Sequence, residues 1–129
     1  MKNSKPIRIL VVDDHFMVRM GLSASLNVES DMEVVAEAGN GTAALEAFRK
    51  HRPNLVMMDL RLPGMSGTEC TAEILREFPE THVVMITVND TPELREAAKE
   101  SGASRFIPKP QLWRMLPDIL QELANDNRR

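Results

Sequence analysis

The sequence contains very little cysteine and no long hydrophobic run. Cys70 is the only cysteine among 129 residues, so no disulfide can form within the chain, which is typical of proteins in a reducing cytosol. We expect Cys70 to be a small core residue rather than a nucleophile. The apolar run Ile9–Val12 is too short to cross a membrane, and unlike a secretory signal it ends in acids. A cytoplasmic protein without membrane contact is therefore predicted.

Positive charge is also scarce. The chain has 16 lysines and arginines against 19 acidic residues, a net charge of −3, so no broad basic surface predicts binding to nucleic acid or anionic lipid. Internal repeats, low-complexity segments and long linkers are missing as well. The length favours one domain over residues 1–129, with a core from about 6 to 124 and a short polar tail at 125–129.

Short apolar segments alternate about five times with helical patterns. Three of these segments are almost continuously apolar, which is typical of central strands covered on both faces. A regular alternation of this kind predicts an α/β fold in which a parallel sheet lies between helices. The expected strands are Ile7–Val12, Glu33–Glu37, Asn54–Met58, His82–Thr87 and Ser104–Ile107.

The helices between the strands are predicted from apolar faces and end signals. Thr91 and Pro92 form an N-cap followed by proline at the first helical position, and Gly102 favours a helix end. Pro117 either lies in the first turn of the last helix or kinks it. Trp113 lies either at the edge of the core or on an exposed docking surface. The apolar faces expected in the core are Met17, Met20, Ala24 and Val28; Ala44 and Phe48; Cys70, Ile74 and Phe78; and Leu112, Leu116, Ile119, Leu120 and Leu123.

Five polar residues stand at the carboxyl ends of the predicted strands, where open parallel sheets bind their ligands. They are Asp13, Asp14, Asp59, Thr87 and Lys109. Clustered carboxylates repel one another unless a cation joins them, and carboxylate oxygens suit Mg²⁺. A cation, a lysine and a hydroxyl around a carboxylate favour phosphoryl transfer, with the carboxylate itself able to act as the nucleophile.

The chain resembles a known family over the range from about Ile7 to Leu123. The stretches that carry the resemblance are RILVVDDHFMVRMGL, EVVAEAGNGTAALE, PNLVMMDLRLPGMSG, VVMITVND and SGASRFIPKP. Together they resemble the receiver domain of two-component response regulators, most closely those that precede LuxR-type helix-turn-helix domains. The resemblance implies a flavodoxin-like doubly wound (βα)5 fold, with five parallel strands in the order 2-1-3-4-5.

The resemblance also implies roles for the residues at the strand ends. Asp59 would be the phosphoacceptor. Asp13, Asp14 and Asp59 would bind Mg²⁺ (or Mn²⁺) together with the backbone carbonyl of Arg61. Lys109 would pair with the phosphoryl group. The phosphoryl donor would be a histidine kinase or a phosphotransfer protein.

A coupled movement would then transmit the signal. Thr87 would turn inward to bond the phosphoryl oxygen, and Phe106 would follow into the vacated space. The bond from Lys109 to Pro110 is expected to be cis. Ser66, where relatives often have aspartate, is expected in a loop or a helix cap.

Such a switch is not an enzyme with an external product, because it modifies only itself. A homodimer is one expected assembly. Contact with DNA is expected only through an output domain that this chain lacks, and the chain is either a free-standing receiver or the front half of a transcriptional regulator.

One rival interpretation comes from the segment Gly39–Ala44. It matches the G-x-G-x-x-A variant of the dinucleotide-binding fingerprint, and Asp59 follows at the spacing of a ribose-binding acid. The fingerprint belongs on the first strand of its unit, however, and here a complete strand–helix unit precedes it. Asn40-Gly41 is otherwise a plain turn before a helix.

Two further interpretations use the same acidic site. An aspartate-nucleophile phosphatase would need its assisting acid close behind the nucleophile after the first strand and a cap over the substrate, and no insertion is long enough for a cap. A pure interaction module would keep the pocket without its chemistry. The three histidines are scattered, which favours surface or loop positions over a metal or relay role; they are His15, His51 and His82.

Overall fold

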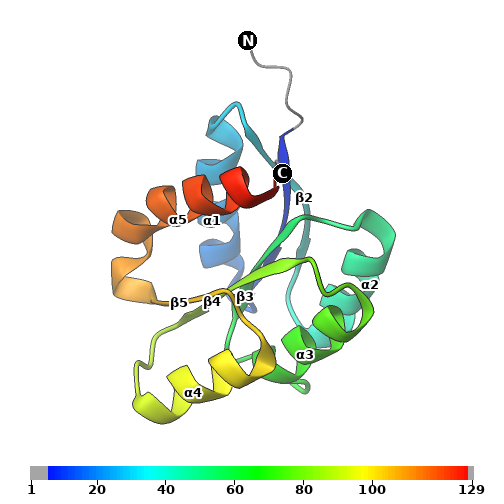
Figure 1. Ribbon diagram of the computed structural model, residues 1–129, viewed down its shortest axis with the longest axis vertical. Coiled ribbons are helices and arrows are strands. Elements are labelled where there is room, and N and C mark those ends of the chain that lie inside the picture. The colour runs from blue at the N-terminus through cyan, green and yellow to red at the C-terminus, as the bar shows by residue number, and fades with distance from the viewer. Residues whose placement is uncertain (1–5, 128–129) are drawn as a thin grey trace.

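The computed structural model describes residues 6–127, in which five strands and five helices alternate along the chain (Figure 1). A 3₁₀ turn, Lys109–Gln111, connects the last strand to the last helix. The elements are β1 (Ile7–Val12), α1 (Phe16–Val28), β2 (Met32–Ala38), α2 (Gly41–His51), β3 (Leu55–Asp59), α3 (Gly67–Glu77), β4 (His82–Thr87), α4 (Pro92–Ser101), β5 (Arg105–Pro108) and α5 (Leu112–Asn127).

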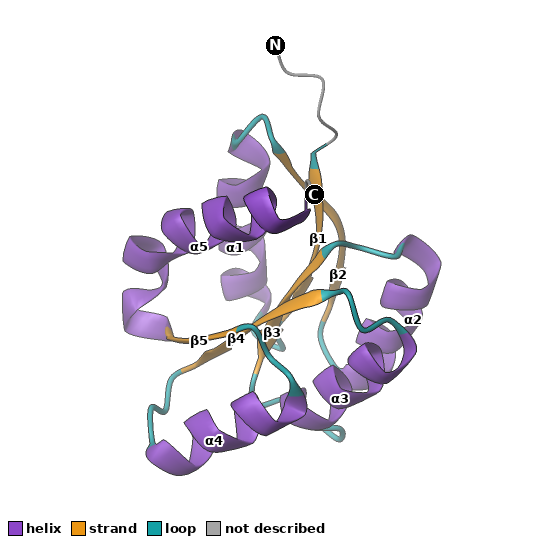
Figure 2. Cartoon of the chain, viewed as in Figure 1, coloured by secondary structure: helices purple, strands orange, loops and turns teal. Residues whose placement is uncertain are grey.

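All five strands form one parallel sheet in the order β2-β1-β3-β4-β5, which confirms the predicted doubly wound fold. Helices α1 and α5 cover one face of the sheet, and α2, α3 and α4 cover the other (Figure 2). Alternate residues of β1, which is buried except at Arg8, divide between the two layers. Ile9 and Val11 pack beneath α1 and α5, whereas Leu10 and Val12 pack beneath α2 and α3.

The strand predictions are accurate to within one residue at each end. β3 extends to Asp59, because this residue still pairs in register with Ile86 of β4. Asn54 lies outside the strand, where its side-chain oxygen accepts a hydrogen bond from the amide of Arg8 at 2.9 Å. The sheet therefore carries Asp59 at the very end of a paired strand, in a fixed orientation.

The core face predicted for α1 is wrong. Met17 is 74% exposed and Val28 is 80% exposed, while Leu22 and Leu26 are buried. Met20 and Ala24 are exposed as well. The helix carries two apolar faces at helical spacing, so periodicity alone did not identify the one that meets the sheet. The exposed residues Phe16, Met17 and Met20 consequently form an apolar strip on α1.

The other helix faces are confirmed, with Phe78 only half-buried and the remaining residues buried. Burial raises the pKa of the Cys70 thiol to about 11, in keeping with an inert core residue. Thr91 caps α4 by accepting a hydrogen bond from the Leu94 amide, and Gly102 ends that helix with a φ of 100°.

The last helix resolves the questions about Pro117 and Trp113. Pro117 lies inside α5, beyond its first turn, so a late helix start is wrong. Trp113 is 54% exposed and therefore is not a core residue. Residues 125–127 continue α5, whereas residues 1–5 and 128–129 lie outside the described part. None of the described helices is long and apolar enough to cross a membrane.

Candidate functional site

The parallel sheet brings the predicted site residues to one edge. Asp13 directly follows β1 and is fully buried, and Asp59 at the end of β3 is only 4% exposed. Thr87 ends β4 and is fully buried, and Lys109 directly follows β5. Asp14 lies beside Asp13 with its side chain partly exposed. Four strands thus deliver three carboxylates, a hydroxyl and an ammonium group to the same place, as predicted.

The backbone after Asp59 is held against α3. The amide of Gly67 donates a hydrogen bond to the carbonyl of Leu60 at 2.9 Å. A Cβ atom at Gly67 would lie 2.3 Å from the Asp59 carbonyl oxygen, so only glycine permits this approach. Ser66 caps α3 in a reciprocal capping box with Glu69, which confirms its expected capping role.

Lys109 bridges two of the carboxylates. Its Nζ atom lies 3.1 Å from Asp13 Oδ2 and 3.6 Å from Asp59 Oδ2. The first contact has an ion-pair distance but not hydrogen-bond geometry, so Asp13 Oδ2 is buried without a hydrogen bond from any described residue. Asp59 Oδ1 accepts a hydrogen bond from the Arg61 amide at 3.2 Å. A single lysine therefore faces more carboxylate charge than it can neutralise.

The electrostatics of the site disfavour the charged form of Asp59. Burial, and next the negative charge of Asp13, raise the pKa of Asp59 to about 6. Lys109 and the Arg61 amide oppose this rise without cancelling it. A divalent cation beside these carboxylates would stabilise the ionised form, so the pKa of Asp59 indicates a site built for additional positive charge.

This raised pKa predicts a pH dependence of stability in the metal-free protein. The pKa of Asp59 is about 6 in the folded chain against an ordinary 3.8, so the folded state binds the proton more tightly. The free energy of unfolding should therefore fall as the pH rises from about 4 to about 6, by on the order of 1–3 kcal/mol from this group. Urea unfolding in a chelator, for wild type and Asp59→Asn at pH 4.5 and 7.5, measures the difference. Equal pH dependence in both proteins would contradict it.

Two residues that contact the acidic edge were not predicted from the sequence to do so. His15 is exposed and lies in the loop before α1, which confirms the expected surface or loop position, and its Nδ1 atom lies 3.1 Å from Asp14 Oδ1 and 3.3 Å from Asp13 Oδ1. Arg19 donates a hydrogen bond from Nη1 to the Asp13 carbonyl at 2.6 Å and from Nε to Glu37 at 3.2 Å. Sequence position was the available signal for these contacts. His15 directly follows the acid pair, and Arg19 lies one helical turn after His15.

The region around β5 departs from expectation at one point. No peptide bond among residues 6–127 is cis, so the cis bond expected between Lys109 and Pro110 is wrong. Pro110 instead lies in the first turn of a 3₁₀ helix that leads directly into α5, a geometry that requires trans bonds.

Thr87 Oγ1 accepts a hydrogen bond from the Asn89 amide at 3.1 Å. Phe106 is half-buried, and the Arg95 guanidinium lies 4.8 Å from its ring centre.

The glycines of the apparent dinucleotide fingerprint have structural roles. Asn40 caps α2 by accepting a hydrogen bond from the Ala43 amide at 2.8 Å. A Cβ atom at Gly41 would lie 2.8 Å from Cβ of Met65, and one at Gly39 would lie 3.3 Å from the Arg19 guanidinium. The segment follows the edge strand β2. These contacts explain the glycines without a nucleotide.

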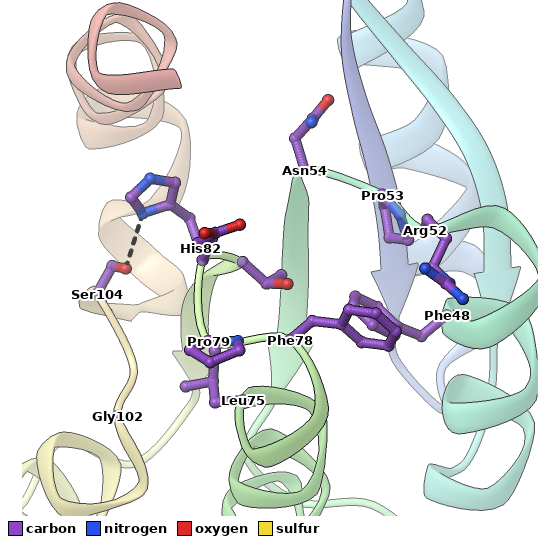
Figure 3. A pocket seen from close by; sticks show the side chains of 12 residues that line it. Phe48, Arg52, Pro53, Asn54, Leu75, Phe78, Pro79, His82, Gly102 and Ser104 are labelled. Atoms are coloured by element: carbon purple, nitrogen blue, oxygen red, sulfur yellow. Dashed lines mark hydrogen bonds between the residues drawn. The ribbon is translucent and has the colours of Figure 1, made fainter. Parts of the chain in front are cut away.

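A hollow of about 770 Å³ lies at the opposite ends of the strands, where Asn54 precedes β3 and His82 begins β4 (Figure 3). The Phe48 and Phe78 rings contact each other there with their centres 5.3 Å apart, and the Arg52 guanidinium lies 4.3 Å from the centre of the Phe78 ring. The His82 Nδ1 atom lies 3.2 Å from the Ser104 Oγ atom, within hydrogen-bond distance. None of the five predicted site residues lines this hollow, so we assign the chemistry to the acidic edge.

The donor atoms at the acidic edge fit a small cation. Asp13, Asp14, His15 and Asp59 each offer a ligand atom, and these atoms all lie within 4.8 Å of one another. Opposite ligands of an octahedral Mg²⁺ ion are about 4.2 Å apart, so only small side-chain movements are needed. Asp13 Oδ2 is buried and accepts no hydrogen bond from the described residues, although Lys109 Nζ lies 3.1 Å away, so a bound cation would give this oxygen a further partner.

Comparison with known proteins gives one consistent result. A family model described as the response regulator receiver domain matches residues 9–121. The response regulator protein VraR of Staphylococcus saprophyticus is 40% identical over 123 residues, which are 94% of this chain and 58% of VraR. The chain therefore spans little more than half the length of this relative.

The solved structures similar to this chain are also response regulators. The receiver domain of the putative response regulator NarL from Mycobacterium tuberculosis is 34% identical, with a TM-score of 0.76 over 81% of this chain and 84% of that one. A two-component response regulator of the LuxR family from Aurantimonas is 30% identical, with a TM-score of 0.76 over 97% of this chain and all of that one. These similarities confirm the resemblance to LuxR-type receivers.

Proposed function

The chain belongs to the response regulator receiver domain family, and from that premise we propose that Asp59 accepts a phosphoryl group from the phosphohistidine of a sensor kinase or phosphotransfer protein. One observation carries the proposal: Asp59 is a nearly buried acid at the end of a central strand, 3.6 Å from Lys109 and next to Asp13. A buried carboxylate with a lysine and further acids around it suits an aspartyl phosphate better than a structural ion pair.

The transfer is a substitution at phosphorus. A carboxylate oxygen of Asp59 forms a bond to phosphorus while the bond from phosphorus to the donor histidine breaks, and the histidine keeps the electron pair. Lys109 stabilises the negative charge on the phosphoryl oxygens, because its ammonium group already lies between Asp13 and Asp59. Water later attacks phosphorus, the bond from phosphorus to the Asp59 oxygen breaks, inorganic phosphate leaves and the carboxylate is restored, so the chain modifies only itself.

Asp13, Asp14 and Asp59, with the backbone carbonyl of Arg61, would hold Mg²⁺ or Mn²⁺. Bound there, the cation supplies charge neutralisation for the carboxylates and the incoming phosphoryl oxygens. The chain itself fixes the ligands. The Arg19 guanidinium holds the carbonyl of Asp13, and the capped start of α3 lies against the segment that follows Asp59.

The phosphoryl group would change the surface around α4 and β5. Its oxygens would accept a hydrogen bond from the Thr87 hydroxyl, whose oxygen now accepts one from the Asn89 amide at 3.1 Å. Movement of Thr87 would carry the β4–α4 loop with it. Asp90 of that loop binds Arg95, which stacks on Phe106, so the loop and the aromatic ring are mechanically linked.

The partners follow from the same role. The exposed apolar strip of α1 begins three residues after Asp13, with Phe16, Met17 and Met20, and it would contact the phosphohistidine-bearing partner. Exposed apolar surface could also form the interface of a homodimer. Binding to DNA would require an output domain beyond these residues, and the cytoplasmic location stays a prediction.

The direct test is the intact mass of the protein after incubation with acetyl phosphate. We expect a gain of one phosphoryl group that requires Mg²⁺, is prevented by a chelator and is removed by hydroxylamine, as acyl phosphates are. Steady release of product from p-nitrophenyl phosphate would instead favour the phosphatase interpretation. No mass gain from either acetyl phosphate or a phosphorylated kinase would leave a pure interaction module.

A further inference from the structure

His15 is placed toward the acidic edge by its backbone as well as by its ring. Its amide donates a hydrogen bond to Asp13 Oδ1 at 2.8 Å, which fixes the residue relative to the buried acid. Its Nδ1 atom then lies 3.3 Å from that same oxygen and 3.1 Å from Asp14 Oδ1. The side chain is 68% exposed, so the ring is accessible to an incoming ion while this one nitrogen faces the carboxylates.

Lys109 and His15 contact different oxygens of the acidic cluster. Lys109 contacts the Oδ2 atoms of Asp13 and Asp59, whereas His15 contacts the Oδ1 atoms of Asp13 and Asp14. The two groups therefore do not compete for one position. Lys109 therefore supplies positive charge on the Oδ2 side of the cluster, whereas the Oδ1 atoms of Asp13 and Asp14 face His15.

We propose that His15 Nδ1 is an additional ligand of the divalent cation bound by Asp13, Asp14 and Asp59, and that it shifts the preference of the site from Mg²⁺ toward Mn²⁺. The four donor atoms already lie within 4.8 Å of one another. Mg²⁺ strongly prefers oxygen ligands, whereas an imidazole nitrogen favours transition-metal ions. The inference rests on the proposed function in one respect: it concerns the same cation.

The test uses metal binding by the unphosphorylated, metal-free chain. Mn²⁺ is titrated into the protein, and the concentration of free Mn²⁺ is measured by room-temperature electron paramagnetic resonance. Mg²⁺ affinity is measured by the Mn²⁺ that added Mg²⁺ displaces. The variant is His15→Asn, because asparagine is a good N-cap at this first position before α1 but lacks the imidazole nitrogen. His51→Asn, at the end of α2 and outside the acidic cluster, is the matched control.

We expect His15→Asn to weaken Mn²⁺ binding about tenfold or more while Mg²⁺ affinity changes less than about twofold. Pulsed resonance spectra of the Mn²⁺ complex should show a ¹⁴N coupling from the imidazole in wild type and in His51→Asn. The coupling should be missing in His15→Asn. The spectrum is decisive, because a purely structural role for His15 would not produce it.

The other outcomes overturn the inference. Equal weakening of both cations without a nitrogen coupling in wild type would mean that His15 only shapes the loop. Tighter binding of both cations to His15→Asn would mean that the ring competes with the metal. In either case Mg²⁺-dependent mass gain from acetyl phosphate would show that the phosphoacceptor role stands. Absence of both metal binding and mass gain in wild type would overturn both proposals.

Discussion

Asp59→Asn is expected to abolish the phosphoryl gain from acetyl phosphate completely while leaving the fold intact. The amide has nearly the shape of the carboxylate and can still accept the Arg61 hydrogen bond, but it is too weak a nucleophile to form an acyl phosphate. The substitution also removes one of several mutually repelling charges from a buried site, so it should not cost stability at neutral pH.

The measurement is intact mass after incubation with acetyl phosphate and Mg²⁺, with circular dichroism to check the fold. Asp118→Asn is the matched control, because Asp118 is an exposed carboxylate on α5, outside the acidic cluster. This control should gain the phosphoryl group at the wild-type rate. A modification of equal lability that persisted in Asp59→Asn would move the acceptor to another residue and overturn the assignment.

The acidic edge was predictable because it depends on topology more than on detail. In a parallel sheet, the carboxyl ends of all strands meet at one edge, so strand positions alone brought Asp13, Asp59, Thr87 and Lys109 together. An error of one residue in a strand boundary, as at Asp59, leaves that convergence unchanged. The fold followed from the same alternation of strands and helices.

What the sequence did not predict depends on side-chain direction. Both faces of α1 are apolar, and the choice between them follows from how the helix lies on the sheet. His15 and Arg19 contact the site because a loop places one imidazole nitrogen beside the carboxylates and because one guanidinium reaches back to the Asp13 carbonyl. Arg19 needs the space left by Gly39, a contact between residues on different elements that no local pattern reveals.

Gly67→Ala is expected to destabilise the protein by about 3 kcal/mol or more. The new methyl group would lie 2.3 Å from the Asp59 carbonyl oxygen and 2.9 Å from the Leu60 Cα atom. Both neighbours belong to the backbone and cannot rotate away as a side chain could. Either α3 or the end of β3 has to move. Urea unfolding with the metal removed measures the loss.

Gly21→Ala is the matched control. Gly21 lies in α1, and a Cβ atom added there would meet no atom of another element within 4 Å, so alanine should stabilise the helix by about 0.5–1 kcal/mol. The same substitution at the two positions is thus expected to act with opposite sign. If Gly67→Ala cost no more than a surface change, α3 would not press on the backbone of Asp59. The placement of the acceptor would then depend on the β3–β4 pairing alone.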